Sequence, residues 1–216
     1  MLPVKFPLID KKHFPILLLM TAMYITGLIG LNLADSRAIF RWFVPWHLLA
    51  NAVLLLYFHE DWNRHFFIFC VVTYLTGFLV EWAGVETGVI FGKYWYGNTL
   101  GLKLAGIPLM IGVNWLVLVY ITGVLCEPLK VHFLFKAILA ASLMTGLDFL
   151  IEPVAMKHDF WQWENSVVPF RNFVGWWLTA LLLQVLFQKL TFEKKNPFAW
   201  WVFGLQILFF ASQWLF

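Results

Sequence analysis

The chain has 216 residues, of which 62% are hydrophobic and 12% are charged, and its mean hydropathy is +0.78. So little charge cannot cover the surface of a soluble domain of this size, which excludes that class and indicates an integral membrane protein. The formal net charge of +3 is small and dispersed along the chain, so it does not indicate nucleic-acid binding.

Seven apolar runs follow one another along the chain, and each is close to the 17–25 residues that a helix needs to cross the hydrocarbon of a bilayer. They cover residues 14–31, 42–58, 66–84, 107–125, 132–150, 172–190 and 198–215. The alternating segments of a membrane β-barrel do not occur. The sequence therefore predicts an all-α, polytopic membrane helix bundle of about seven transmembrane helices, as a single domain over residues 1–216. The first run is too long for the apolar region of a signal peptide, so we expect it to remain as the first span.

Two connections, residues 85–106 and 151–171, are longer than the others and rich in glycine and aromatic residues. Counting spans places both on the same side of the membrane. Nine of the 15 lysines and arginines lie on the other side, and three of these nine precede the first run: Lys5, Lys11 and Lys12. The positive-inside rule then predicts a cytoplasmic N-terminus and external long loops. The expected location is a bacterial cytoplasmic membrane.

The stretch Asp148–Asn172 combines carboxylates with tryptophans at the end of an apolar run. Asp148 and Glu152 are four residues apart and share a helix face, and Pro153 predicts a bend or stop just after them. An Asp within a membrane span costs about 2.5–3.5 kcal/mol. Burial and a like-charged neighbour favour keeping one carboxyl protonated, and a protonated acid beside a carboxylate suits general acid–base chemistry. The alternative is a hydrogen bond or contact between helices.

The counterpart stretch, residues 81–108, has Glu81 and Glu86 before an aromatic loop. Five residues apart, these two do not share a helix face, so at least one is expected past the helix end. Five loop aromatics fit two accounts, an interfacial belt or a wall of π faces that stabilises a transient cation, and the belt is simpler for most. They are Tyr94, Trp95, Tyr96, Trp161 and Trp163.

A repeated sequence spacing links the two stretches. Pro108 to Trp115 and Pro169 to Trp176 share a P-x6-W spacing, each after an aromatic loop. This spacing predicts two similar helical hairpins around a shared cavity, although 13 tryptophans allow it by chance. Arg171 and Asn172, which open the sixth run, can orient a carboxylate or a water, and Arg171 equally suits an interfacial anchor.

Known cofactor motifs are missing from the sequence. The six histidines show no pairing suited to haem, and HExxH, GxSxG, Walker and dinucleotide-binding motifs do not occur. We therefore expect no metal and no cofactor.

The stretch EWAGVETGVIFGKYWYGNTLGLKLAGIP at Glu81–Pro108 resembles the signature E-x-x-G-x-x-T-G-x-x-F-G-x-Y-x-Y-x-x-x-L-G-x-x-x-x-G-(I/V)-P of CruF-type carotenoid hydratases. These include γ-carotene 1′-hydroxylases and bisanhydrobacterioruberin hydratases. The second stretch resembles the same family in Asp148-x-x-x-acid-Pro, in W-x-W at Trp161–Trp163, and in V-P-x-x-N-(F/Y)-x-G-W at Val168–Trp176. The resemblance covers about residues 66–185. Two departures concern the substrate more than the reaction: Glu152-Pro153 replaces the Asp-Pro of many members, and the loop before Val168 is shorter than in archaeal members.

The resemblance implies addition of water across the terminal C1–C2 double bond of an acyclic carotenoid ψ end, giving a tertiary alcohol without a redox cofactor. In this scheme Asp148 is the acid and Glu152 or Glu81 the base. The candidate catalytic residues are Asp148, Glu152, Glu81 and Glu86. The candidate substrate contacts are Tyr94, Tyr96, Trp82, Trp161, Trp163, Asn172 and Trp176. The expected partners are a carotenoid and the lipid bilayer, with a homo-oligomer left open.

Two other readings remain open at the level of sequence. A carotenoid cyclase or isomerase also begins by protonating an alkene, but it loses a proton instead of gaining water. A carotenoid-binding or small-solute transport protein would use intramembrane acids as hydrogen-bonding groups or proton relays. Such a protein would leave the mass of its pigment unchanged.

Overall fold

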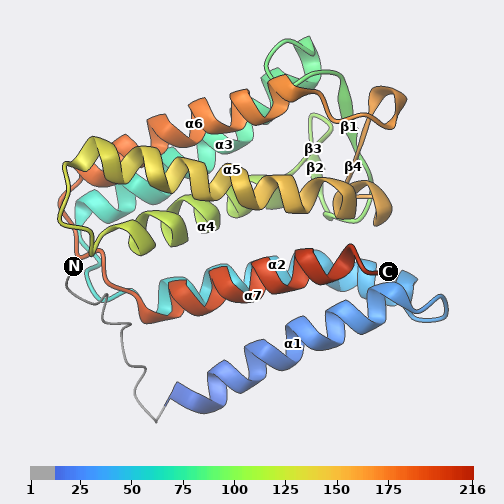
Figure 1. The fold of residues 1–216 in the computed structure, drawn as a ribbon, viewed down its shortest axis with the longest axis horizontal. Helices are drawn as coiled ribbons and strands as arrows, with labels where there is room; N and C mark the ends of the chain where they lie inside the picture. The colour runs from blue at the N-terminus through green and yellow to red at the C-terminus, as the bar shows by residue number, and fades with distance from the viewer. Residues whose placement is uncertain (1–12) are drawn as a thin grey trace.

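The computed structural model describes residues 13–216 and contains seven α-helices in that range (Figure 1). They are α1 Phe14–Asn32, α2 Arg37–Tyr57, α3 Arg64–Thr87, α4 Leu109–Cys126, α5 Phe133–Lys157, α6 Phe170–Lys189 and α7 Pro197–Gln213. Six of them, α1 to α6, are long and apolar enough to cross a membrane. The predicted all-α polytopic bundle is therefore confirmed, with the 17-residue α7 as its shortest helix.

Local sequence signals set several of the helix ends. The side chains of Asn63 and Asn196 accept hydrogen bonds from Phe66 N and Phe198 N, and so cap α3 and α7. Gly88 ends α3 with φ of 63°, a left-handed conformation that glycine adopts without steric cost. These caps satisfy backbone groups that a helix end otherwise leaves unpaired.

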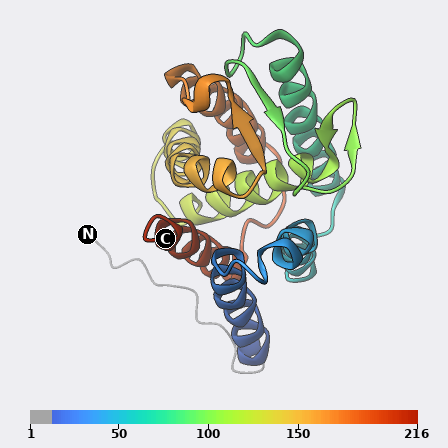
Figure 2. The ribbon, with the colours of Figure 1, turned by 90° about the vertical axis from the view of Figure 1, so that its right-hand side faces the viewer.

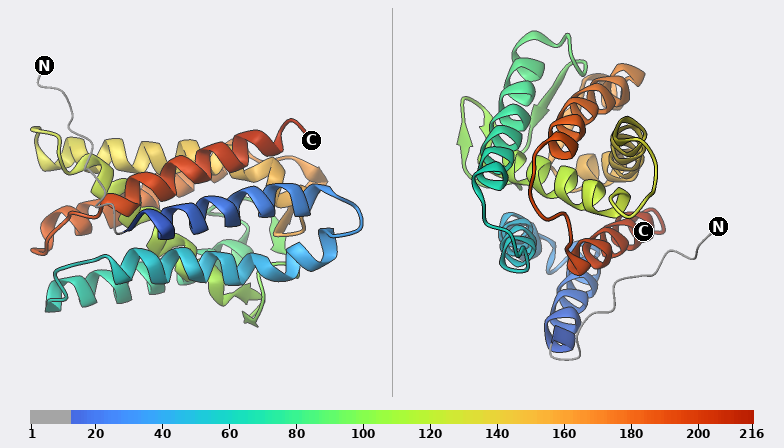
Figure 3. Two further views of the ribbon diagram at one scale, coloured as in Figure 1. Left: turned by 90° about the horizontal axis from the view of Figure 1, so that it is seen from below. Right: turned by 90° about the vertical axis from the view of Figure 1, so that its left-hand side faces the viewer.

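Helix α4 lies at the centre of the bundle and packs against α2, α3, α5, α6 and α7. All ten of its last residues, Val117 to Cys126, are buried, so it contributes much of the core. Helices α3 to α6 form one group, and α1, α2 and α7 lie together below them in Figure 1. Helix α1 is at the edge of the molecule, where it packs on α2 and α7 (Figures 2 and 3).

The two long connections meet at one end of the bundle, on the right of Figure 1, and contain four short strands. Strand β1 (Tyr94–Tyr96) pairs antiparallel with β4 (Trp161–Trp163), although about 65 residues separate them. Strands β2 (Lys103–Leu104) and β3 (Ile107–Pro108) form a hairpin, and Glu164–Ser166 is a short 3-10 helix. The sequence predicted that both loops lie on the same side, and it did not predict the strands.

Two predicted helix ends were wrong. Pro153 lies inside α5, which continues to Lys157, and Glu86 lies inside α3, which continues to Thr87. A proline in a membrane helix is tolerated where neighbouring side chains satisfy the freed backbone groups. Pro153 frees the carbonyl of Phe149, and Trp214 Nε1 donates to the neighbouring carbonyl of Leu150 at 3.2 Å.

The structure does not test the predicted orientation. Lys5, Lys11 and Lys12, on which the charge bias partly depends, lie outside the described residues. A cytoplasmic N-terminus therefore stays a prediction.

Candidate active site

The carboxylate of Glu81, on α3 and 2% exposed, is the acceptor for three side-chain donors. Its Oε2 accepts from the Tyr94 hydroxyl at 2.6 Å and from the Tyr96 hydroxyl at 2.7 Å. Its Oε1 accepts from Trp115 Nε1 at 3.0 Å. Glu81 is thus a buried, fully hydrogen-bonded acid about two turns from the end of α3.

Strand geometry explains how two tyrosines reach one carboxylate oxygen. Alternate residues of a strand point to the same face, so Tyr94 and Tyr96 turn inward while Trp95 turns outward. Burial, followed by the charge of Glu81, raises the pKa of both tyrosines well above the ordinary value. Both hydroxyls therefore stay protonated and act as donors at any physiological pH.

The carboxylate of Glu152, on α5, has an equivalent set of partners. Its Oε2 accepts from Trp161 Nε1 at 2.9 Å and from Trp163 Nε1 at 2.7 Å. Its Oε1 accepts from Asn172 Nδ2 at 2.9 Å. Strand β4 supplies its two tryptophans from alternate positions, as β1 supplies the two tyrosines. Three donors stabilise the ionised form of this carboxylate.

Asp148 lies one helical turn before Glu152 and has far fewer partners. Its side chain is fully buried, and Oδ2 accepts one hydrogen bond, from Asn172 Nδ2 at 3.1 Å. Asp148 Oδ1 and Asn172 Oδ1 are both buried with no hydrogen-bond partner among the described residues. The Asn172 amide thus bridges two carboxyl groups, and Asp148 is the one with an unused oxygen.

The two hairpins repeat one arrangement, as the P-x6-W spacing predicted. Each places a glutamate on a helix, two aromatic donors on a strand and a tryptophan on the following helix. In the β1–β4 pair, Tyr94 is opposite Trp163, and Tyr96 is opposite Trp161. The two helical tryptophans, Trp115 and Trp176, stack with ring centroids 4.5 Å apart and planes inclined by 26°.

A small cavity of about 10 Å³ lies where the two hairpins meet. Its walls come from both hairpins: Glu81, Tyr94, Tyr96, Ile111, Glu152, Trp161, Trp163, Asn172 and Trp176. This volume is close to what one water molecule needs, and the cavity offers the polar partners that a water needs. Asp148 does not line it and lies behind Asn172, one hydrogen bond away.

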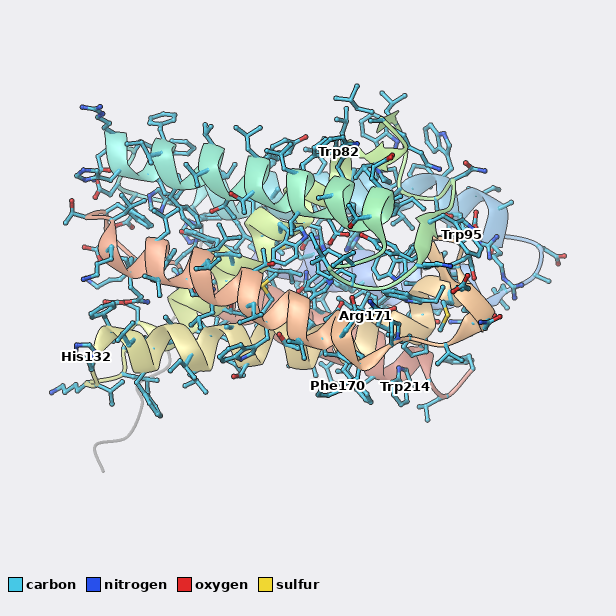
Figure 4. The ribbon with its side chains drawn as sticks, turned by 90° about the horizontal axis from the view of Figure 1, so that it is seen from above. Trp82, Trp95, His132, Phe170, Arg171 and Trp214 are labelled. Carbon is cyan, nitrogen blue, oxygen red and sulfur yellow. The ribbon has the colours of Figure 1, made fainter. Side chains whose placement is uncertain are left out.

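The structure places eight of the eleven predicted site residues around this cavity, and Asp148 one hydrogen bond behind it. The other two are not brought to the cavity, since both lie on the outward side of α3. Glu86 is exposed near the helix end, and Trp82 is 43% exposed on the surface (Figure 4). Because residues one and five positions from Glu81 point away from its face, neither can reach the cavity.

The aromatic belt accounts for fewer loop residues than expected. Trp95 is exposed at the strand end of the molecule, together with Phe170 and Trp214 (Figure 4). The other four loop aromatics are buried and donate to Glu81 or Glu152. Arg171 is exposed, and its closest polar contact is the Gly88 carbonyl at 3.5 Å, which fits an interfacial anchor.

Sequence reasoning missed Trp115 as a site residue and Ile111 as part of the cavity wall. The signal for Trp115 was present, because it ends the P-x6-W spacing whose second copy ends at Trp176. In the part of the chain that the structure describes, no group of three His, Cys, Asp or Glu residues could hold a metal ion.

The fold and the site together define a class: a polytopic helical membrane protein whose buried carboxyl groups are held by aromatic donors at one end of the bundle. Residues 42–215 match the family described as "Carotenoid biosynthesis protein". The chain belongs to this carotenoid biosynthesis family. The match includes every residue of the site described above.

A curated relative gives a finer comparison. The chain is 30% identical to the bisanhydrobacterioruberin hydratase of Haloarcula japonica over 121 aligned residues. The alignment covers 50% of this chain and 40% of the relative, so less than half of the relative's length is matched. No solved structure matches the chain.

Proposed function

We propose that the protein adds water to the terminal C1–C2 double bond of an acyclic carotenoid ψ end, of the lycopene or γ-carotene type. The observation that carries this proposal is the cavity for about one water between Glu81 and Glu152, with Asp148 behind it. Membership of a carotenoid biosynthesis family and the hydratase among its relatives support the substrate class and the reaction.

The proposed first step is protonation of the alkene by Asp148. Asp148 accepts one hydrogen bond, whereas Glu81 and Glu152 each accept three from side chains, so it has the least stabilisation as an anion. Its unpaired Oδ1 is the proposed proton donor. The proton goes to the less substituted alkene carbon, and a tertiary cation forms on the other carbon. The substrate end must therefore come within reach of Oδ1, past Asn172.

The second step is capture of the cation by water. The buried carboxylates and the aromatic rings around the cavity stabilise the positive charge. As the water oxygen bonds to the cation, its proton passes to a carboxylate that lines the cavity, Glu152 or Glu81. Glu152 is the simpler base, because it lies one helical turn from Asp148 and the Asn172 amide donates to both carboxyl groups. Exchange of protons with water after the product leaves then returns Glu152 to the carboxylate and Asp148 to the acid. Atoms and charge then balance without a redox cofactor.

The test is coexpression in a lycopene-producing bacterium, with a γ-carotene producer as a parallel host, followed by mass analysis of the pigments. We expect the wild-type protein to add one water. Asp148→Asn should lose about 10²–10⁴-fold of the activity, the usual range for a general acid. Glu86→Gln, which changes an exposed acid near the end of α3, is the matched control and should keep wild-type activity.

Other outcomes would contradict the proposal. Unchanged mass with altered retention would identify a cyclase or isomerase. Unaltered pigment in both hosts, from correctly inserted protein, would favour a binding or transport protein.

A further inference from the structure

A second and larger cavity, of about 110 Å³, lies between the two helix groups. Helices α1, α2 and α7 form one wall, through residues such as Gly27, Val44 and Phe209. Helices α4 and α5 and the two long loops form the other wall, with Leu100 and Ile151. The walls are mainly aliphatic and aromatic, so the cavity suits a hydrocarbon ligand.

This cavity adjoins the small cavity between the carboxylates. Ile111 and Trp161 line both of them. Trp161 also donates to Glu152, so a ligand in the larger cavity would contact a ring that holds the proposed base. The two cavities therefore share these two side chains in their walls, so a chain lying in the larger one can place its end beside the acids.

The length of the cavity and the exposure at its edge fit a hydrocarbon chain that enters from the bilayer. On α1 the lining runs from Met23 to Leu31, which is about 12 Å along the helix axis. Phe43, at the α2 side of the cavity, is 48% exposed on a helix that is long and apolar enough to cross a membrane. The volume is somewhat below that of an apolar cavity of about 150 Å³ that takes up benzene. It therefore suits a short branched stretch of hydrocarbon.

We propose that this cavity binds the polyene chain of the carotenoid directly behind its reacting end group, and so determines which carotenoids reach the acids. The inference rests on the proposed function for the identity of the reacting end. Family membership does not itself assign the site, since the family match begins at residue 42 and the α1 wall lies outside it.

Gly27 offers a way to fill the cavity from α1. A Cβ at Gly27 would meet its nearest neighbour, Phe209 Cε2, at 3.7 Å, an ordinary contact. Gly27→Phe should therefore fold while its ring occupies the cavity. Gly146→Phe on α5 is the matched control, because that glycine is exposed and nothing lies within 4 Å of its Cβ position. Val44→Phe narrows the cavity from α2, at another point of the same wall, if Gly27→Phe does not accumulate.

The experiment purifies each protein in mild detergent from the lycopene-producing host and measures total bound carotenoid per mole of folded protein by absorbance. Mass analysis of the same extract gives the hydrated fraction. We expect Gly27→Phe and Val44→Phe to lose carotenoid several-fold, and Gly146→Phe to retain it like the wild type.

Two results would overturn the inference: equal carotenoid in the Gly27→Phe, Val44→Phe and Gly146→Phe proteins, or a wild type that copurifies with lipid acyl chains and no carotenoid. The two proposals fail in different ways. Wild-type protein that binds carotenoid through this cavity but adds no water contradicts the proposed function alone. Hydration that Gly27→Phe leaves unchanged contradicts the cavity assignment alone.

Discussion

At the scale of single residues, the site is defined by how unequally its three acids are hydrogen-bonded. Glu81 and Glu152 each have three side-chain donors, and Asp148 has one. The sequence located all three acids, because carboxyl groups in apolar helices are rare and costly. It could not assign their donors, since that depends on which loop aromatics turn inward.

Two amide variants distinguish between Glu152 and Glu81 as the base. If Glu152 takes the proton from water, Glu152→Gln should lower the turnover about 10²–10⁴-fold. Glu81→Gln should then cost much less, because Glu81 would act only on the charge of the cation. Single-turnover rates of the purified variants would measure both. Full turnover by Glu152→Gln with loss in Glu81→Gln would reverse the assignment.

The contribution of the Trp115–Glu81 hydrogen bond to the stability of the protein can be measured with a Trp115 variant. Trp115→Phe keeps most of the ring but leaves Glu81 Oε1 without its donor, which costs about 1–3 kcal/mol for a buried acceptor. Trp201→Phe removes an indole donor to Thr21 at an exposed position and should cost less. Thermal unfolding in detergent would compare the stability of the two variants. Equal losses of stability would show that the hydrogen bond to Glu81 contributes no more than the exposed one to Thr21.

At the scale of elements, helices were predictable and strands were not. Apolar runs of spanning length predict helices, because a lipid-facing backbone must satisfy its own hydrogen bonds. Strands β1 and β4 are three residues long, and they form by pairing with each other across the chain. The Tyr-x-Tyr and Trp-x-Trp alternation was visible, but its partner strand was not.

The docking of the two loops can be disturbed at Gly97. Its N–H donates to the Phe160 carbonyl at 2.9 Å, and a Cβ there would collide with Asp159. Gly97→Ala should therefore lower stability by about 1–3 kcal/mol, as overpacking does, and reduce activity with it. Gly146→Ala, where a Cβ meets nothing within 4 Å, is the control in the same unfolding assay. An unaffected Gly97→Ala protein would show that the loops do not need this close approach.

At the scale of the whole molecule, one helix group holds the acids and the other helps to enclose the apolar cavity beside them. This division could not be read from the sequence, because the apolar runs of α1, α2 and α7 look alike whether they face lipid, core or cavity. Composition nevertheless sufficed for the class of the molecule, since charge is too scarce for a soluble surface.

The orientation of the whole molecule in the membrane can be tested directly. The charge bias predicts that the strand end faces outward and the α6–α7 connection faces the cytoplasm. With Cys70 and Cys126 replaced by alanine, Leu102→Cys should react with an impermeant thiol reagent on intact cells. Lys195→Cys, at the other end, should react only after the membrane is opened. The reverse pattern would invert the orientation.

The central claim, water addition at the acid cavity, is tested most directly with purified protein and lycopene or γ-carotene in water labelled with heavy oxygen. The account predicts that the product gains one water and that its new hydroxyl carries the label in full. A hydroxyl without the label would mean that the oxygen comes from elsewhere, and a product of unchanged mass would mean that no water is added. Either result would contradict the account.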